Sequence, residues 1–474
     1  MGSLLGKYYA ARQSRGQYRS CAVTGSYLFT QDAVSSEDAL VKLLKDSLWK
    51  VLQRHSALCY GVAEKTANSE AQFIRLRAIE WDDVVEFRYS GVADERDVVL
   101  ASTIGTAHQH LFKDPYRTPA WKIIVLQHHQ VPGASSIRVD IAFVSHHAIS
   151  DGTSCVAFHK TLYYFLSQGP SSSPGSTWPY IVPISIPPPI AIEDTLQLNP
   201  GLRNSQSRPF KSTGAVNHDT SDAWTAAPPS LPSLDDYVSR VLLLRVPSPQ
   251  LQGVLKVCRR LNITLTGLLH GFILMYLSQT VHEARGFRSI TPYSMRRFTG
   301  FSEDEIINHV SSIVTHWDES ILTSLRSCRD QQSEEGILLR ISSRFRDQIT
   351  EELAQVPVKG AEALVGISEI LDFDALCESS MKRKRGSTYE VSNIGSFKFY
   401  HGAGEEAGSV KLEKLIFTQC GMVAGPAFGC SVVTVFGGPM VLSLHWQEGI
   451  IEEDMLVGLK TFLELKLLSF GQGA

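Results

Sequence analysis

The strongest structural signal in this chain is the sequence IRVDIAFVSHHAISDGTSCVAFHKTLYYFL, residues 137–166. Its first part, Ile137–Ser145, is rich in β-branched and apolar residues and follows a Pro-Gly pair, so it predicts a strand. Apolar residues at helical spacing in the last part predict a helix. The polar segment HHAISDG, residues 146–152, is therefore expected at a strand-to-helix turn.

This turn carries the one group of residues in the chain whose types and spacing indicate a catalytic role. A neutral imidazole accepts a proton near pH 7, so His147 is the candidate general base. Asp151 would hold the turn, through backbone N–H groups or a buried arginine. Gly152 would let the chain enter the helix closely packed, and His146 is expected to shape the turn through hydrogen bonds.

A metal site is the alternative interpretation of the two histidines. Adjacent side chains on extended backbone point in different directions, which opposes joint ligation by His146 and His147. No Asp or Glu stands near them at the spacing of an HExxH motif. We therefore predict no metal ligands in this segment.

Composition places the chain among globular proteins. It has 474 residues, of which 43% are hydrophobic and 20% charged, and its length predicts two or three domains. Lys and Arg total 45 against 48 Asp and Glu, giving a formal net charge of -3, so no nucleic-acid partner is expected. The eight cysteines are scattered without a CxxC pair and are expected to be reduced thiols.

The sequence offers no clear membrane or export signal. The first twenty residues lack an apolar core, so no secretory signal is expected. The longest apolar stretch, Leu265–Leu277, is too short for a transmembrane helix and predicts a buried helix. A cytoplasmic protein is expected, with peripheral membrane association through the N-terminal segment left open.

A break in composition suggests how the chain is divided. Residues 169–232 are dense in Pro, Ser and Gly, and such a stretch does not sustain helix or central strand. We predict an N-terminal lobe over residues 1–185, a crossover linker over 186–235 and a C-terminal lobe over 236–474. Turn-rich inserts are expected at 285–302 and 402–408.

Periodicity on both sides of the linker predicts an α/β (α+β) fold with a mixed sheet and helices in each half. Helices are expected at 38–58, 251–260, 264–279 and across most of 319–352. Strands are expected at 121–127, 137–145, 238–246, 389–392, 412–418, 430–436 and 441–446.

The segment His146–Gly152 resembles the HHxxxDG signature of the coenzyme-A-dependent acyltransferase superfamily, which includes chloramphenicol acetyltransferase and peptide-synthetase condensation domains. Further segments resemble the alcohol O-acetyltransferase-like branch common in fungi, and their order around the histidine motif is what supports the resemblance. They are RGQY (15–18) with Tyr27, RHSAL (54–58), PAWK (119–122), PYSMRR (292–297), VSNIG (391–395) and FGG to WQEG (436–449). The DFGWG hallmark of plant BAHD enzymes is absent, so that branch fits less well.

The resemblance implies two similar lobes that enclose a tunnel with the motif at its midpoint. The second histidine, here His147, would be the base, and Asp151 would pair with an arginine, Arg296 or alternatively Arg297. Asn393 or a backbone N–H of its turn, which begins at Ser392, would contact the oxyanion or line the tunnel. The basic run Lys382, Arg383, Lys384 and Arg385 would meet the phosphates of the donor.

The function implied is acyl-CoA-dependent transfer, most simply of acetyl to a hydroxyl of a small or medium apolar acceptor, in a ternary complex. Acyl-CoA is a co-substrate and no bound cofactor is expected. One alternative keeps the tunnel but uses a longer donor or one bound to an acyl-carrier protein, or an amine nucleophile, or forms a ring. Another is a non-catalytic binding protein of the same fold. A monomer is expected.

Overall fold

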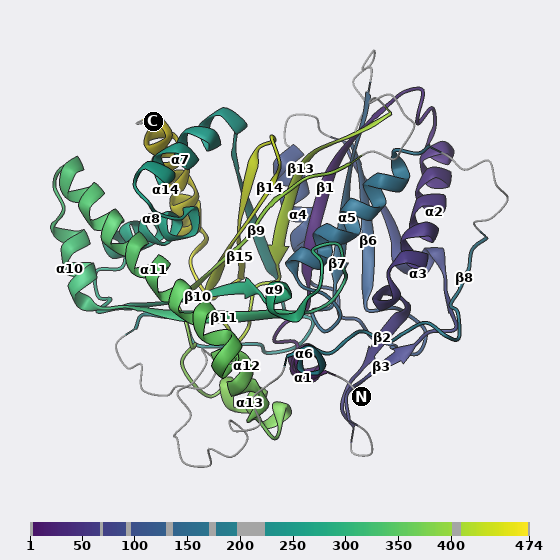
Figure 1. The fold of residues 1–474 in the computed structure, drawn as a ribbon, viewed down its shortest axis with the longest axis horizontal. Coiled ribbons are helices and arrows are strands. Elements are labelled where there is room, and N and C mark those ends of the chain that lie inside the picture. Colours follow the sequence, from purple (N-terminus) through teal and green to yellow (C-terminus); the bar gives the residue numbers. More distant parts are fainter. Residues whose placement is uncertain are drawn as a thin grey trace.

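The computed structural model describes residues 3–66, 70–91, 96–128, 136–169, 177–196, 223–400 and 409–472. Two halves lie side by side, each built on its own sheet; in Figure 1 one half is mostly purple and blue and the other mostly teal, green and yellow. The predicted α/β class with a mixed sheet in each half is confirmed.

The first sheet has the strand order β13-β1-β7-β6-β5, in which only the β5–β6 pair is parallel. The helices that cover it are α2 (Glu37–Arg54), α4 (Arg96–Ala107) and α5 (Gly152–Leu166). Its strands are β1 (Cys21–Thr30), β5 (Val85–Ser90), β6 (Trp121–His128), β7 (Ser136–Ser145) and β13 (Val410–Gln419).

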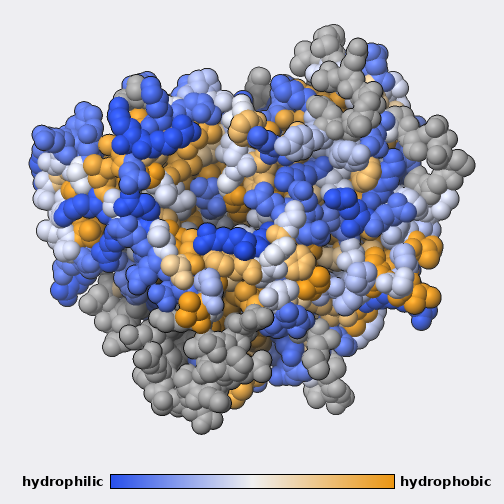
Figure 2. All heavy atoms as spheres, in the orientation of Figure 1, coloured by the Kyte–Doolittle hydropathy of each residue, from blue (hydrophilic) through white to orange (hydrophobic). Residues whose placement is uncertain are grey.

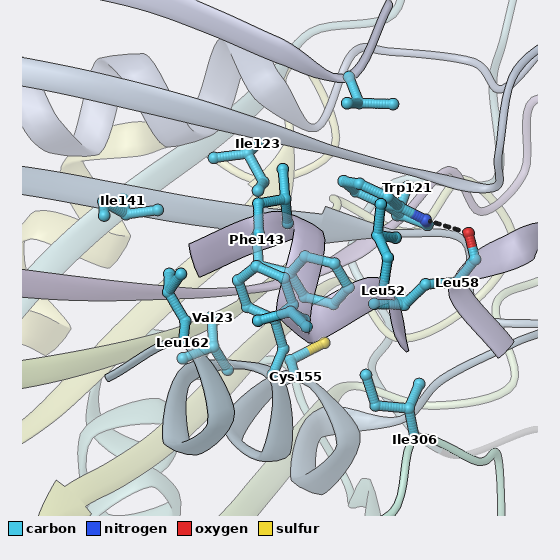
Figure 3. Close-up of a cluster of buried hydrophobic side chains, with 14 of the residues drawn as sticks. Val23, Leu52, Leu58, Trp121, Ile123, Ile141, Phe143, Cys155, Leu162 and Ile306 are labelled. Atoms are coloured by element: carbon cyan, nitrogen blue, oxygen red, sulfur yellow. Dashed lines mark hydrogen bonds between the residues drawn. The ribbon is translucent and has the colours of Figure 1, made fainter. Parts of the chain in front are cut away.

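Alternation along the strands explains how α5 is held on this sheet. Phe143 of β7 stacks on Phe158 of α5 with ring centroids 4.0 Å apart. Figure 3 shows Cys155 and Leu162 of the same helix facing Val23 and Ile141 of the sheet. This packing fixes the end of β7 against the start of α5, which is where the histidine turn lies.

The second sheet has the strand order β11-β10-β12-β14-β15-β9. Its strands are β9 (Ser239–Val246), β10 (Phe287–Ser294), β11 (Val310–Trp317), β12 (Tyr389–Phe397), β14 (Phe428–Val435) and β15 (Met440–Gln447). The helices of this half are α7 (Ser248–Arg260), α8 (Leu265–Thr280), α9 (Arg296–Thr299), α10 (Glu319–Ser327), α11 (Gln331–Lys359), α12 (Glu362–Ser368), α13 (Phe373–Ser380) and α14 (Glu453–Gln472).

Smaller elements complete the chain, and one of them matters for the site. The helix α1 (Leu4–Ser14), which the sequence analysis did not predict, lies near α12 and α13 where the two halves meet at the bottom of Figure 1. The others are a 3-10 turn (Ser56–Cys59), β2 (Tyr60–Ala63), β3 (Gln72–Arg75), β4 (Ala78–Ile79), α3 (Trp81–Val84), β8 (Tyr180–Ile181) and α6 (Ile192–Thr195).

The predicted turn-rich insert at 285–302 is wrong, because β10 and α9 occupy most of it. Pro292 lies within β10, opposite Ser312 of β11, and beyond the short pairing of β10 with β12 at Ser289 and Ile290. The other predicted insert, 402–408, lies outside the described residues.

The two sheets do not separate at the predicted linker. β13 follows residue 235 in the chain yet pairs with β1 in the first sheet. Of the linker itself, the structure describes 186–196 and 223–235. The division into lobes at these boundaries therefore stays a prediction, and the crossover of β13 is a feature that composition did not indicate.

The surface in Figure 2 shows hydrophobic residues gathered in the middle of this face, around the place where Figure 1 labels α9 and α6. Hydrophilic residues cover much of its left margin. Within the described ranges, no single helix has the length and hydrophobicity to cross a bilayer; only α7 and α8 taken together meet the test, and they are bent by 99°.

Candidate functional site at the histidine turn

Hydrogen bonds between its own residues hold the histidine turn in shape. Ser150 Oγ donates to Ser145 Oγ at 2.6 Å, and the backbone N–H of Ala148 donates to His146 Nδ1 at 2.9 Å. His146 therefore accepts at Nδ1 in its neutral form, and burial lowers its pKa to about 3. Its place inside the turn is that of a structural residue.

Asp151 caps α5 and joins the two halves of the molecule. Its carboxylate accepts from the N–H of Ser154 at 2.8 Å, which is the capping bond. Arg296 of α9 donates to both carboxylate oxygens, at 2.6 and 3.1 Å. Burial alone would raise the pKa of Asp151, but the guanidinium of Arg296 more than offsets it and holds the pKa below its usual value. Arg296, rather than Arg297, forms the ion pair.

His147 lies on the wall of a cavity and is covered by aromatic rings. Tyr9 of α1 stacks on its imidazole with ring centroids 4.0 Å apart and planes inclined by 10°. Tyr18 packs against it at 5.4 Å. Burial lowers the pKa of His147 to about 4, although the Asp151 charge opposes the shift. The imidazole is therefore neutral at pH 7, the form that accepts a proton.

The cavity measures about 720 Å³ and lies between the two halves. Its wall is built by α1, β10, β11, β12, α12, α13 and the loop that follows β13. One part of the lining is apolar, including Leu5, Ile290 and Leu364, whereas Arg12, Arg383 and Lys384 make another part cationic. A volume of this size accommodates a small organic molecule with its polar groups.

A polar chain crosses the cavity wall close to His147. Tyr18 donates from its hydroxyl to Gln419 Oε1 at 2.9 Å, and Gln419 in turn donates from Nε2 to Glu390. Burial raises the pKa of Glu390 to about 7, with Arg12 acting in the opposite direction. These residues come from the segment after α1, from β13 and from β12.

The predicted tunnel residues on β12 lie beside the cavity rather than in its lining. Ser392 is buried, and Asn393 donates from Nδ2 to Thr266 Oγ1 at 3.2 Å while its Oδ1 accepts from the N–H of Gly395 at 3.0 Å. The amide of Asn393 thus ties β12 to the start of α8. Ile394 approaches Gly152, where a Cβ would lie 2.9 Å from Ile394 Cγ2, so that glycine serves close packing.

The predicted basic run divides into two parts. Arg383 and Lys384 are exposed and line the cavity, whereas Lys382 is exposed but does not line it. Arg385 is buried and donates to the carbonyls of Ala227, Met422 and Gly425, with distances from 2.8 to 3.2 Å. Burial lowers its pKa to about 10. Arg385 also lines the cavity, and the phosphate contact predicted for it stays a prediction.

Several lining residues were given no role from the sequence alone. These are Tyr9, Arg12, Tyr18, Glu390 and Gln419, of which Tyr18 belongs to the RGQY segment quoted above. RGQY (15–18) and VSNIG (391–395), already singled out by resemblance, stand beside Arg12 and Glu390, and that was the available signal. Within the described ranges, no group of three His, Cys, Asp or Glu side chains is placed to hold a metal ion.

Comparison with known sequences covers nearly the whole chain. The model of the alcohol acetyltransferase family matches residues 1–465. A probable alcohol acetyltransferase, FCK4, of Fusarium pseudograminearum is 22% identical over 457 residues, covering 90% of this chain and 86% of that protein. The probable alcohol acetyltransferase crmB of Aspergillus fumigatus is 22% identical, covering 94% of each chain.

Comparison with solved structures shows the fold. The trichothecene 15-O-acetyltransferase TRI3 of Fusarium sporotrichioides superposes with a TM-score of 0.72 at 13% identity, covering 99% of this chain and 94% of that one. The condensation domain of the monacolin K polyketide synthase MokA superposes with a TM-score of 0.57 at 14% identity, covering 98% and 97%. The chain therefore shares its fold with that acetyltransferase and with that condensation domain.

Proposed function

Since this chain belongs to the alcohol acetyltransferase family and is an acyltransferase, we propose that it moves an acetyl group from acetyl-CoA to a hydroxyl of a small or medium apolar acceptor, with His147 as the general base. Membership confirms the resemblance drawn from the HHxxxDG segment and its companions. The donor, the base and the acceptor class are the proposed parts.

The observation that carries the proposal is the placement of a neutral, buried histidine on a cavity of substrate size. His147 is 8% exposed and lines the cavity, and its Nδ1 is fully buried. A ligand in the cavity therefore reaches the imidazole through its Nε2 edge. A pKa of about 4 keeps the imidazole neutral at pH 7, and with its one proton on Nδ1 the Nε2 edge accepts a proton.

The proposed reaction uses this one proton carrier. His147 takes the proton of the acceptor hydroxyl as its oxygen bonds to the thioester carbonyl carbon, forming a tetrahedral oxyanion. Collapse of that intermediate breaks the carbon–sulfur bond, and the imidazolium returns the proton to the departing thiolate. The sum is an acetyl ester and free CoA, with no acyl-enzyme. We also propose that Asn393 or a backbone N–H of its turn contacts the oxyanion. In the structure, the Asn393 amide donates to Thr266.

The cationic part of the lining supports a phosphate-bearing donor. Arg383 and Lys384 are exposed where they border the cavity, so they can meet the phosphates of CoA at its entrance. The apolar part, with Leu364 and Ile367 of α12, suits an apolar acceptor. In this proposal, the two substrates meet at His147 from different sides.

The test is thiol release from acetyl-CoA with a panel of alcohols and amines. Wild type is compared with His147→Ala and with His282→Ala, the same change at an exposed surface histidine. Acceptor-dependent release is expected to fall about 10²–10⁴-fold in His147→Ala, the usual magnitude for losing a general base, and to persist in His282→Ala. Full activity of His147→Ala would refute the assignment. No release by wild type with any acceptor would favour a longer or carrier-bound donor.

A further inference from the structure

One carboxyl group in the cavity has no part in the proposed proton transfer. Among the residues that line the cavity, Glu390 of β12 is the one Asp or Glu. It is 5% exposed, and its Oε1 accepts from Gln419 Nε2. Within the described part of the chain, this is the one hydrogen bond its carboxyl group makes, although a carboxylate offers about four acceptor positions.

Glu390 is held in place from the other half of the molecule. Gln419 ends β13 in the first sheet, and its Oε1 accepts from the Tyr18 hydroxyl at 2.9 Å. Tyr18 packs against the His147 ring with centroids 5.4 Å apart. The carboxyl group is therefore fixed by hydrogen bonds that run through Gln419 to Tyr18, whose ring packs against the proposed base on the same cavity.

Burying this group is costly unless a ligand partly compensates it. Desolvation disfavours the charged form and raises the pKa of Glu390 to about 7, against the attraction of Arg12. Tyr9 and Tyr18 are the other titratable groups that sense its charge, and burial raises the pKa of each. A hydrogen-bond donor brought by the substrate would occupy one of the acceptor positions of the carboxylate that Gln419 does not use.

We propose that Glu390 is a specificity-determining residue that accepts a hydrogen bond from a second hydroxyl of the acceptor, so that the preferred acceptors are neutral diols or polyols. The reacting hydroxyl lies at His147 while the second lies at Glu390. This inference rests on the proposed function, because it concerns the acceptor of the same reaction.

The charges around the cavity decide between a hydroxyl and an ammonium group as the donor to Glu390. Arg12, Arg383 and Lys384 line the cavity with the single carboxyl group, so the lining carries an excess of positive charge. Arg12 itself acts on Glu390. A cationic acceptor would be repelled by this field, whereas a hydroxyl donates its hydrogen without adding charge.

The experiment compares matched acceptors at pH 8, where Glu390 is mostly ionised. Linear α,ω-diols of three to eight carbons are measured against 1-alkanols of the same lengths, because the series covers a range of hydroxyl separations. At the best length, kcat/KM for the diol is expected to exceed that for the alkanol by about 10- to 100-fold, the usual worth of a hydrogen bond to a charged group. Glu390→Gln should lower this ratio about 10-fold, mainly through KM of the diol.

The control is Glu352→Gln, which makes the same carboxyl-to-amide change on α11, outside the cavity lining. Thermal unfolding of both variants checks that they fold. An equal ratio of diol to alkanol in wild type and Glu390→Gln would overturn the inference even if transfer itself is confirmed.

A binding measurement separates this inference from the proposed function. Calorimetric titration of the best diol into His147→Ala and into the double variant His147→Ala/Glu390→Gln needs no turnover. Tighter binding to the single variant by about 10-fold would support the role of Glu390. Equal binding would refute it, whatever the transfer assay shows.

Discussion

The Arg296 guanidinium donates two hydrogen bonds, of 2.6 and 3.1 Å, to the Asp151 carboxylate, although the two residues are 145 positions apart in the sequence. Asp151 follows β7 of the first sheet and Arg296 follows β10 of the second. Arg296 also donates to the carbonyls of Ser302, Glu305 and Ile307. The pair therefore fixes the histidine turn relative to the other half of the molecule.

Removing one member of this buried pair is expected to destabilise the fold strongly. Arg296→Met keeps much of the side-chain length but leaves the Asp151 carboxylate buried without its partner, which costs about 3–5 kcal/mol. Urea unfolding measures the change. The control is Arg285→Met, which breaks an exposed ion pair with Glu319 and should cost about 1 kcal/mol or less. Equal losses in the two variants would show that the Asp151 pair is no stronger than a surface contact.

Local patterns in the sequence predicted the parts of this site that depend on neighbouring residues. The β-branched run before His146 and the apolar spacing after Asp151 are confirmed as β7 and α5, since strand and helix periodicity express which face is buried. The predicted role of His146 in shaping the turn rests on the hydrogen bond that its Nδ1 accepts from the N–H of Ala148. The partner of Asp151 came from resemblance alone, with two candidate arginines.

The rest of the site depends on contacts that no local pattern records. Tyr18, Gln419 and Glu390 form one chain of hydrogen bonds, yet Tyr18 and Gln419 are 401 positions apart in the sequence. The helix α1 has no strong apolar face, because the residues it buries include small and polar side chains such as Gly6 and Gln13. Its role becomes visible only once Tyr9 is seen against His147.

The stacked ring of Tyr9 is expected to support the reactivity of His147. Tyr9→Ala would remove one wall of the imidazole site and admit water, so we expect kcat/KM to fall about 10-fold or more, mainly through kcat. Tyr9→Phe keeps the ring and should restore most of the rate. Tyr116→Ala, at an exposed tyrosine, is the control for the substitution itself. Steady-state rates at saturating acetyl-CoA measure the effect, and a fully active Tyr9→Ala would show that the stacking is dispensable.

The pH dependence of the reaction follows from the depressed pKa of His147. Burial lowers that pKa to about 4, so the imidazole stays neutral, and competent as a base, from pH 8 down to about pH 5. With a simple alkanol as acceptor, kcat/KM should lose its His147-dependent part near pH 4 and fall about tenfold per pH unit below it. An unperturbed histidine would give the inflection near pH 6.5, roughly its ordinary pKa. Circular dichroism at each pH verifies that the fold persists, and an inflection near 6.5 would contradict the buried, neutral state.

The cationic lining is expected to bind the donor through the phosphates of CoA, which carry the charge of that molecule. Reversing two cations, with Arg383→Glu and Lys384→Glu, should raise KM for acetyl-CoA about 10-fold, roughly the sum of two exposed charge contacts. The N-acetylcysteamine thioester of acetate carries no phosphate, so its KM should stay nearly constant in the same variant. The control reverses Lys256 and Arg259 on α7, which are exposed and do not line the cavity. Higher salt should reduce the difference between the two donors, since exposed charges are screened within about 10 Å at 0.1 M. If KM rises equally for both donors, these residues shape the entrance without contacting phosphate, and the cationic lining near α13 serves another purpose.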